Sequence, residues 1–120
     1  MEVYYTACGA HLRMSLALIA KQQPQAINKL YKLKQEVFKE GALTAKEKEL
    51  IAVSVSCILK CDTCLETHAL AAVDLGATRD ELREAMLVAM YLTGPSAVIW
   101  SPIIDKILSE DEPLSSQNRT

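Results

Sequence analysis

Hydrophobic residues recur every three or four positions over most of the chain, which is the period of an amphipathic helix. The first clear segment of this kind runs between Pro24 and Gly41, two residues that suit the first turn and the end of a helix. We therefore predict a helix between them. The first twenty residues show only a weak helical stripe, and no element is assigned to residues 1–20.

Two capping-box patterns mark the start of two further helices. Thr44 is followed three positions later by Glu47, and Thr78 by Glu81. The first pattern opens LIAVSVSCIL, which is apolar on nearly all sides and predicts a central, buried helix. The second opens LREAMLVAMYL, which ends at Gly94-Pro95.

Two more helices are expected in the second half of the chain. One should begin near Asp62-Thr63 and end near Asp74, where Gly76 provides a C-terminal stop. The last should cover roughly Ser96–Leu108, with a kink or a break at Pro102 because proline lacks the backbone N–H that a helix interior needs.

The pattern as a whole predicts an all-α fold. The sequence has no Asn-Gly or Asp-Gly hairpin signal and no clean two-residue alternation. We predict a single domain of five or six helices covering residues 1–120. Within it, residues 1–20 form an N-terminal segment of undefined structure, and the polar residues 110–120 form a flexible tail.

Composition narrows the functional classes. Half the residues are hydrophobic, so a chain of this size is expected to bury part of its surface against copies of itself. The net charge is −2 and the sequence has no long basic run, which gives no support for nucleic-acid binding. There is no stretch of about 20 apolar residues to span a membrane. The N-terminus lacks a secretory signal pattern, and a cytoplasmic protein is expected.

The stretch CDTCLETH contains the candidate chemistry. Cys61 and Cys64 stand three apart, and His68 follows four positions after Cys64. In a reducing cytosol such a pair is more often catalytic or metal-binding than a structural bridge. On a helix that begins at Cys61, the Cys64 thiol lies one turn from the His68 imidazole, with ~5–6 Å between their Cβ atoms. That separation allows proton exchange.

This placement favours Cys64 as the activated thiol and Cys61 as the resolving thiol. Amides at a helix N-terminus favour thiolate, and a nearby imidazole can take the proton. The opposite assignment stays open, because in another CxxC arrangement, at a strand-to-helix junction, the first cysteine is the nucleophile. A thiolate beside a second thiol can reduce a peroxide through a sulfenic acid, or exchange with another disulfide.

Glu49 is a candidate third member of the site. It lies on the predicted buried helix and, unlike Glu47, has no capping role to fill. If Glu49 faces inward it needs a partner, because an unpaired buried carboxylate is costly. A proton relay from Glu49 through His68 to Cys64 is conceivable from this spacing.

The set of Glu49, Cys61-x-x-Cys64 and His68 resembles the motif of the alkylhydroperoxidase D (AhpD-like) family. That family belongs to the wider carboxymuconolactone decarboxylase superfamily. The flanking segments LTAKEKELIAVSVS and HALAAVDLGATRDELREAM match as well, and the similarity runs roughly over Pro24–Leu108.

The resemblance implies an all-helical trimer or hexamer that reduces hydroperoxides. A dithiol protein, lipoyl or thioredoxin-like, would be the reductant. Transferred to this chain, the motif implies Cys64 as the peroxidatic thiol and Cys61 as the resolving thiol, with His68 and Glu49 as the proton relay. No cofactor and no metal site are expected. The decarboxylase branch does not use a CxxC pair, so decarboxylation is disfavoured.

One departure from the family pattern concerns the residues between the cysteines. Some members have a histidine there, where this chain has Asp62-Thr63. The acidic side chain of Asp62 could cap the helix, or it could oppose thiolate formation. The strength of the peroxidase activity therefore depends on what this residue does.

Two other functions stay open. The same cysteine pair could serve a protein disulfide exchanger without real peroxidase activity. Alternatively, the chain could be a non-catalytic assembly module, or a zinc-binding one that uses Cys57, Cys61, Cys64 and His68. Those four would line one continuous helix, whereas a tetrahedral site usually draws ligands from two elements. Cys57 is expected to pack in the core instead.

Overall fold

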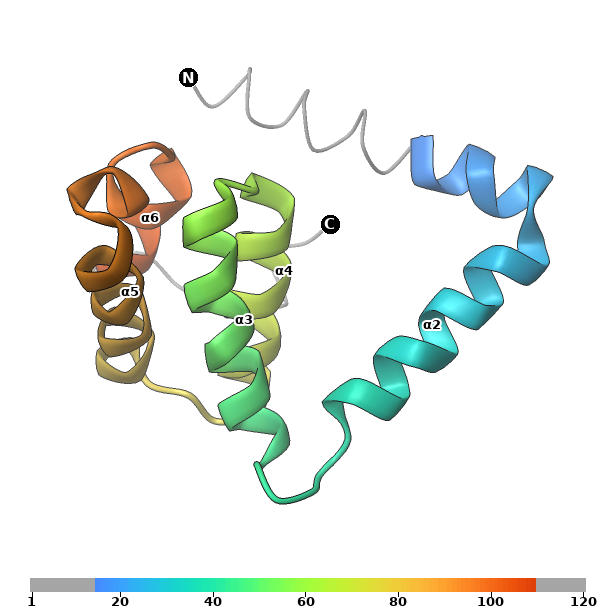
Figure 1. Ribbon diagram of the computed structural model, residues 1–120, viewed down its shortest axis with the longest axis horizontal. Coiled ribbons are helices and arrows are strands. Elements are labelled where there is room, and N and C mark those ends of the chain that lie inside the picture. Colours follow the sequence, from blue (N-terminus) through green and yellow to red (C-terminus); the bar gives the residue numbers. More distant parts are fainter. Residues whose placement is uncertain (1–14, 110–120) are drawn as a thin grey trace. The chain divides into compact units, whose positions relative to one another are not determined.

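The computed structural model describes residues 15–109, and helices make up most of that range (Figure 1). No strand occurs between residues 15 and 109, so the all-α prediction is confirmed. None of the helices in this part of the chain is long and apolar enough to cross a membrane. The predicted flexible tail and most of the predicted N-terminal segment lie outside the described residues. The chain divides into two compact units, residues 1–39 and 40–120.

The first unit contains helix α2, Pro24–Phe38, which begins at the predicted proline. Residues 15–22 form another helix just before it, where no element had been assigned. Ile27 is the buried residue of α2, while Leu30 and Leu33 on the same apolar stripe are exposed.

The second unit contains the remaining helices. They are α3 (Ala45–Leu59), α4 (Asp62–Asp74), α5 (Arg79–Thr93), the 3-10 turn η1 (Pro95–Val98) and α6 (Pro102–Leu108). Helix α3 packs against both α4 and α5, and Figure 1 shows it between them. The helix starts agree with the local signals, because N-caps and prolines act on the turn in which they occur.

The two predicted capping boxes differ in how they are completed. The Glu47 N–H donates to Thr44 Oγ1, and the Thr44 N–H donates back to the Glu47 carboxylate, so the first box is complete. At α5 the Glu81 N–H donates to Thr78 Oγ1. The Glu81 carboxylate forms an ion pair with Lys46 of α3, Nζ–Oε2 3.0 Å, and the hydrogen bond from Lys46 lowers the pKa of Glu81.

The predicted break at Pro102 is confirmed. Pro102 is the first residue of α6, where its missing N–H costs no helical hydrogen bond. Ser101 is the N-cap, and its hydroxyl accepts from the Ile103 N–H at 3.3 Å. At the other end of α6, the Arg79 guanidinium donates to the carbonyls of Ile107 and Ser109, which ties α6 to the start of α5.

The core of this unit draws on all four of its α-helices. Its most deeply buried members are Val53, Cys57, Leu65, Ala72, Leu82, Met86, Ala89, Ala97, Ile104 and Ile107. Aliphatic and small side chains fill this core, as the scarcity of aromatic residues requires.

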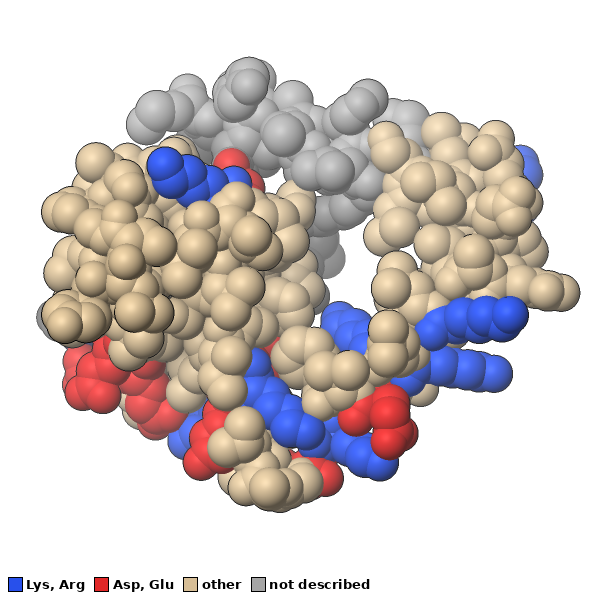
Figure 2. All heavy atoms as spheres, viewed as in Figure 1, with Lys and Arg blue, Asp and Glu red and all other residues tan. Residues whose placement is uncertain are grey.

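The opposite face of α3 is not covered in the single chain. Ile51, Val55, Ile58 and Leu59 are all exposed, so the prediction of a helix buried on every side is wrong for one chain alone. The reason is that the neighbours of α3 within its unit cover only one side of it. The upper parts of α3 and α5 carry few charged side chains in Figure 2, and most of the charge gathers near their lower ends.

The turn between α3 and α4 depends on an unusual backbone conformation at Lys60. Lys60 has φ 52° and ψ 46°, in the left-handed region. Its N–H donates to the Cys57 carbonyl at 3.3 Å, and the Cys61 N–H donates to the Ser56 carbonyl at 3.2 Å. These bonds satisfy the last carbonyls of α3 and turn the chain back along it, which places Cys61 at the start of α4.

Substitutions at Lys60 test this conformation. Lys60→Gly and Lys60→Ala remove the same exposed side chain, but only glycine adopts a positive φ without a steric cost. The glycine variant should therefore have a free energy of unfolding about 1 kcal/mol higher than the alanine variant. Urea denaturation measures the difference, and equal stabilities would contradict the left-handed turn.

Candidate active site

A hydrogen bond between a buried carboxylate and a half-buried imidazole joins α3 to α4. Glu49 is only 6% exposed, and its carboxylate faces inward, as expected for a residue of the buried stripe of α3. Its Oε2 atom lies 2.6 Å from Nδ1 of His68, seven residues into α4. The carboxylate thus has the partner that its burial demands.

The local sequence explains why these two side chains meet. Glu49, Val53 and Ser56 are spaced by four and three residues, so they share the face of α3 that packs inside the unit. On α4, His68 lies one turn after the buried Leu65. Only Lys60 and Cys61 separate the two helices, so α4 runs back beside α3 and the two inward faces oppose each other.

The hydrogen bond orients the imidazole. A neutral His68 that donates its Nδ1–H to Glu49 carries its acceptor lone pair on Nε2. The pair is therefore suited to accept a proton at Nε2 and to return it.

Cys61 and Cys64 form a disulfide at the start of α4, with 5.3 Å between their Cα atoms. Cys61 is the N-cap residue and Cys64 is the third residue of the helix. The Cys64 N–H donates to Cys61 Sγ at 3.3 Å, and Thr63 Oγ1 lies 3.6 Å from the same sulfur. Both cysteines are half-buried.

The two sulfurs therefore have different neighbours that could stabilise a thiolate. The helix N–H that was expected to favour a thiolate at Cys64 is directed to Cys61 instead. Cys64 retains His68 one turn further along the same helix. No sequence signal distinguished the two sulfurs in this way, because the N-cap position of Cys61 depends on the turn at Lys60.

The third described cysteine has a different environment. Cys57 lies on α3, is fully buried and is a free thiol. Burial raises its pKa to about 11, so it stays protonated at neutral pH. Its predicted role in core packing is confirmed.

The argument against zinc assumed that its four ligands would line one continuous helix from Cys57 to His68, and that assumption is wrong. The helix ends at Leu59, and the chain reverses at Lys60, so Cys57 belongs to a different helix from Cys64. Between residues 15 and 109, no group of three His, Cys, Asp or Glu side chains is arranged to hold a metal ion.

Asp62 has a partner that the sequence did not suggest. The Ser101 hydroxyl donates a hydrogen bond to Asp62 Oδ1, and Ser101 is only 5% exposed. A serine just before Pro102 is a recognisable N-cap signal for α6. Its contact with a residue 39 positions earlier depends on the packing of α6 against α4 and could not be inferred locally.

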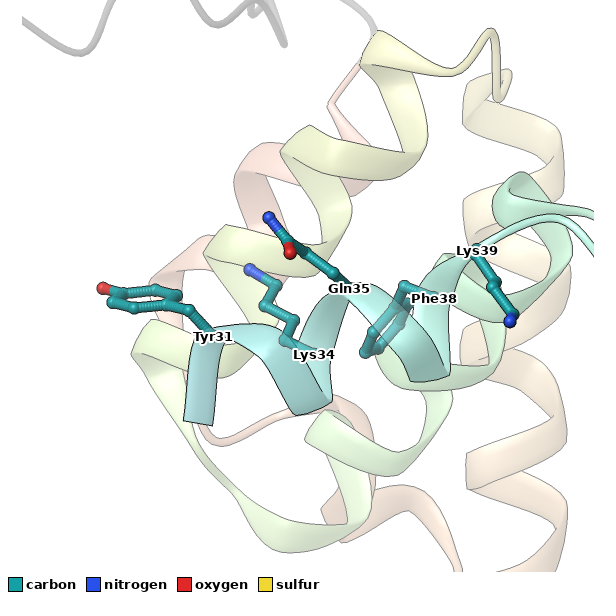
Figure 3. A pocket seen from close by; sticks show the side chains of 5 residues that line it. All are labelled: Tyr31, Lys34, Gln35, Phe38 and Lys39. Atoms are coloured by element: carbon teal, nitrogen blue, oxygen red, sulfur yellow. The ribbon is translucent and has the colours of Figure 1, made fainter. Parts of the chain in front are cut away.

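A shallow hollow occurs on the first unit, away from these residues in the sequence. Its lining is Tyr31, Lys34, Gln35 and Phe38 of α2 together with Lys39, the C-cap residue of that helix (Figure 3). It contains neither a thiol nor an imidazole, so no redox chemistry is assigned to it.

Comparison with known proteins identifies the family. The model of the carboxymuconolactone decarboxylase family matches residues 24–101, which is more than half of the chain. The chain belongs to the carboxymuconolactone decarboxylase family. The family recognised from the Glu49, CxxC and His68 pattern is thereby confirmed.

Two curated relatives from this comparison are themselves uncharacterised. A protein of the cox locus of Paracoccus denitrificans is 38% identical over 65 residues, which is 54% of this chain and 59% of the relative. A protein of Cupriavidus necator is 28% identical over 83 residues, covering 69% of this chain and 74% of the relative. The chain thus matches little more than half the length of the Paracoccus protein.

Solved structures of the family have the same fold. A carboxymuconolactone decarboxylase family protein from Legionella pneumophila superposes with a TM-score of 0.77 at 28% identity, covering 88% of this chain and 94% of that one. A family protein from Thermotoga maritima has a TM-score of 0.68 at 25% identity, covering 82% and 85%. The Thermotoga protein is named for a proposed part in an antioxidative response.

Proposed function

We propose that this family member is a thiol-dependent peroxidase that reduces hydroperoxides through Cys61 and Cys64. The observation that carries the proposal is the hydrogen bond between the buried Glu49 carboxylate and His68, one helical turn from Cys64. The antioxidative role for which the Thermotoga neighbour is named supports the same chemistry.

The first step forms a sulfenic acid at Cys64. Nε2 of His68 takes the thiol proton, and the Cys64 thiolate attacks one oxygen of the O–O bond. That bond breaks, the sulfur keeps one oxygen, and the alkoxide leaves with the proton that His68 returns. The products are an alcohol and Cys64 sulfenic acid, with no change in the total number of protons.

Glu49 acts through His68 rather than on the substrate. Its carboxylate holds the Nδ1 side of the ring, so Nε2 is the nitrogen that exchanges the proton. It also stabilises the imidazolium that exists while the proton is on the ring.

The second step closes the disulfide. The Cys61 thiolate attacks the sulfur of the Cys64 sulfenic acid, and hydroxide leaves and becomes water by taking a proton. The Cys64 N–H and the Thr63 hydroxyl near Cys61 Sγ favour the thiolate that this step requires. The product has the Cys61–Cys64 bond found in the structure.

A dithiol protein then resets the enzyme. One of its thiolates attacks Cys64 Sγ, Cys61 leaves as a thiolate, and the second donor thiol resolves the mixed disulfide. A low-pKa leaving group departs faster, which again suits the N-cap sulfur of Cys61. The donor that we propose is a lipoyl or thioredoxin-like protein in the cytosol, and the cycle needs no cofactor or metal.

Cysteine variants test this cycle. With a dithiol reductant present, Cys64→Ser should lower peroxide consumption to the background rate of the reductant alone. Cys61→Ser should lose turnover but still form one sulfenic acid per chain, which a dimedone-type probe labels. Cys57→Ala is the matched control, since it removes a buried thiol outside the pair and should keep the wild-type rate.

The outcomes separate the alternatives. Equal peroxide consumption in wild type, Cys64→Ser and Cys61→Ser would overturn the proposal. Sulfenic acid in Cys64→Ser but not in Cys61→Ser would mean that Cys61 is the peroxidatic thiol and Cys64 the resolving thiol. Rapid exchange with model disulfides, without peroxide turnover, would assign a protein disulfide exchanger.

We also propose that the chain forms a homo-oligomer, a trimer or a hexamer. The support is the uncovered apolar surface of α3 described above, together with Leu87, Val88, Tyr91 and Leu92 on α5, all of which are exposed. Exposed apolar side chains in this number are typical of an interface between chains.

Light scattering after size-exclusion chromatography tests the assembly. The measured mass should be three or six times the 13.2 kDa of one chain. Val55→Asp, which places a charge in the exposed apolar face of α3, should shift the protein toward smaller species. A wild-type mass equal to that of one chain would contradict the proposal.

A further inference from the structure

We propose that Asp62, held in place by Ser101, sets the reduction potential of the Cys61–Cys64 pair. The proposal deepens the proposed function, because it describes what sets the equilibrium between the dithiol and the disulfide of the same pair. It rests on that function only in requiring that the pair be oxidised and reduced reversibly. Asp62 is the first residue of α4 and directly follows Cys61.

Cys61, and not Asp62, caps the N-terminus of α4. Asp62 could either cap the helix or oppose thiolate formation, and the N-cap of α4 is Cys61, whose own sulfur accepts the Cys64 N–H. The Asp62 carboxylate accepts from Ser101 instead. Its remaining influence on the cysteines is the effect of its negative charge.

Ser101 fixes the place of that charge. Its hydroxyl oxygen accepts the Ile103 N–H as the N-cap of α6, and its single hydroxyl hydrogen is donated to Asp62 Oδ1. Ser101 is buried, and α6 packs against α4, so the donor cannot move without disturbing that packing. The carboxylate is therefore held in the N-terminal turn of α4, where both sulfurs lie.

The charge acts differently on the two redox states. The positive end of α4 and the Cys64 N–H favour a thiolate, and an anion in the same helical turn opposes it. The disulfide carries no charge and is not affected in this way. Asp62 thus destabilises the reduced pair relative to the disulfide, which lowers the reduction potential and makes the dithiol a stronger reductant.

Equilibration with glutathione measures this effect without any peroxide. The reaction is the dithiol plus glutathione disulfide giving the protein disulfide plus two molecules of glutathione. Asp62→Asn keeps an oxygen that can accept the Ser101 hydrogen bond and removes only the charge. We expect the equilibrium constant for disulfide formation to fall about threefold to tenfold, where tenfold corresponds to about 30 mV of higher potential.

The matched control is Asp74→Asn. Asp74 is the last residue of the same helix, about 18 Å along its axis from Asp62, and the substitution makes the same change in net charge. It should leave the equilibrium constant at the wild-type value. An equal shift in both variants would reduce the effect to net charge and overturn the proposal.

Ser101→Ala separates positioning from structural support. With Asp62 intact, Ser101→Ala should lower the equilibrium constant for disulfide formation with glutathione, as Asp62→Asn does. The change should be smaller, because the released carboxylate can turn toward water. In the Asp62→Asn background Ser101→Ala should cause no further shift, while Ser101→Thr should retain the wild-type constant.

A purely structural clamp predicts a different result. It would lower the melting temperature of Ser101→Ala and Asp62→Asn but leave every glutathione constant unchanged, and that outcome overturns the proposal. Asp62→Ser is the second variant if Asp62→Asn does not fold. A protein that turns over no peroxide would still report the shift, so failure of the proposed function and failure of this inference are distinguishable.

Discussion

The hydrogen bond between Glu49 and His68 is the interaction on which the rest of the site depends. A carboxylate as deeply buried as that of Glu49 is tolerated only with a partner, and its partner comes from a different helix. This requirement couples the register of α3 to that of α4. The left-handed turn at Lys60 provides the tight reversal that brings the two inward faces together.

The same arrangement gives the two cysteines unequal surroundings. Cys61 ends the reversal and receives the hydrogen-bond donors of the α4 N-terminus, while Cys64 lies on the helix within one turn of the imidazole. A thiol that attacks needs a base, and a thiol that resolves and leaves needs a stabilised thiolate. The proposed division of roles follows from these two environments. The fixed charge of Asp62 then tunes how readily the pair stays reduced.

Local signals in the sequence were sufficient for most of the fold. Thr44, Thr78 and Pro102 each act within the turn where they occur, so the starts of α3 and α5 and the break at Pro102 were predicted from a few neighbouring residues. The sequence singled out Glu49, which has no capping role, as a residue that would need a partner if it faced inward. The uncovered face of α3 and the contact between Ser101 and Asp62 depend on tertiary packing, so the sequence did not reveal them. The donors at Cys61 are local, but they depend on the left-handed turn at Lys60, which had no sequence signal.

A double-mutant cycle on the relay tests the central claim most directly. The quantity is the single-turnover rate of sulfenic acid formation at Cys64 in Glu49→Gln, His68→Gln and the double variant, with Glu47→Gln as a control that removes a capping carboxylate of the same helix. The double variant and His68→Gln should each form sulfenic acid roughly 100-fold more slowly than wild type. Because Glu49 acts through the imidazole, the double variant should be no slower than His68→Gln alone. The control should keep the wild-type rate. Independent, multiplying losses from the two substitutions, or no loss from either, would contradict the account.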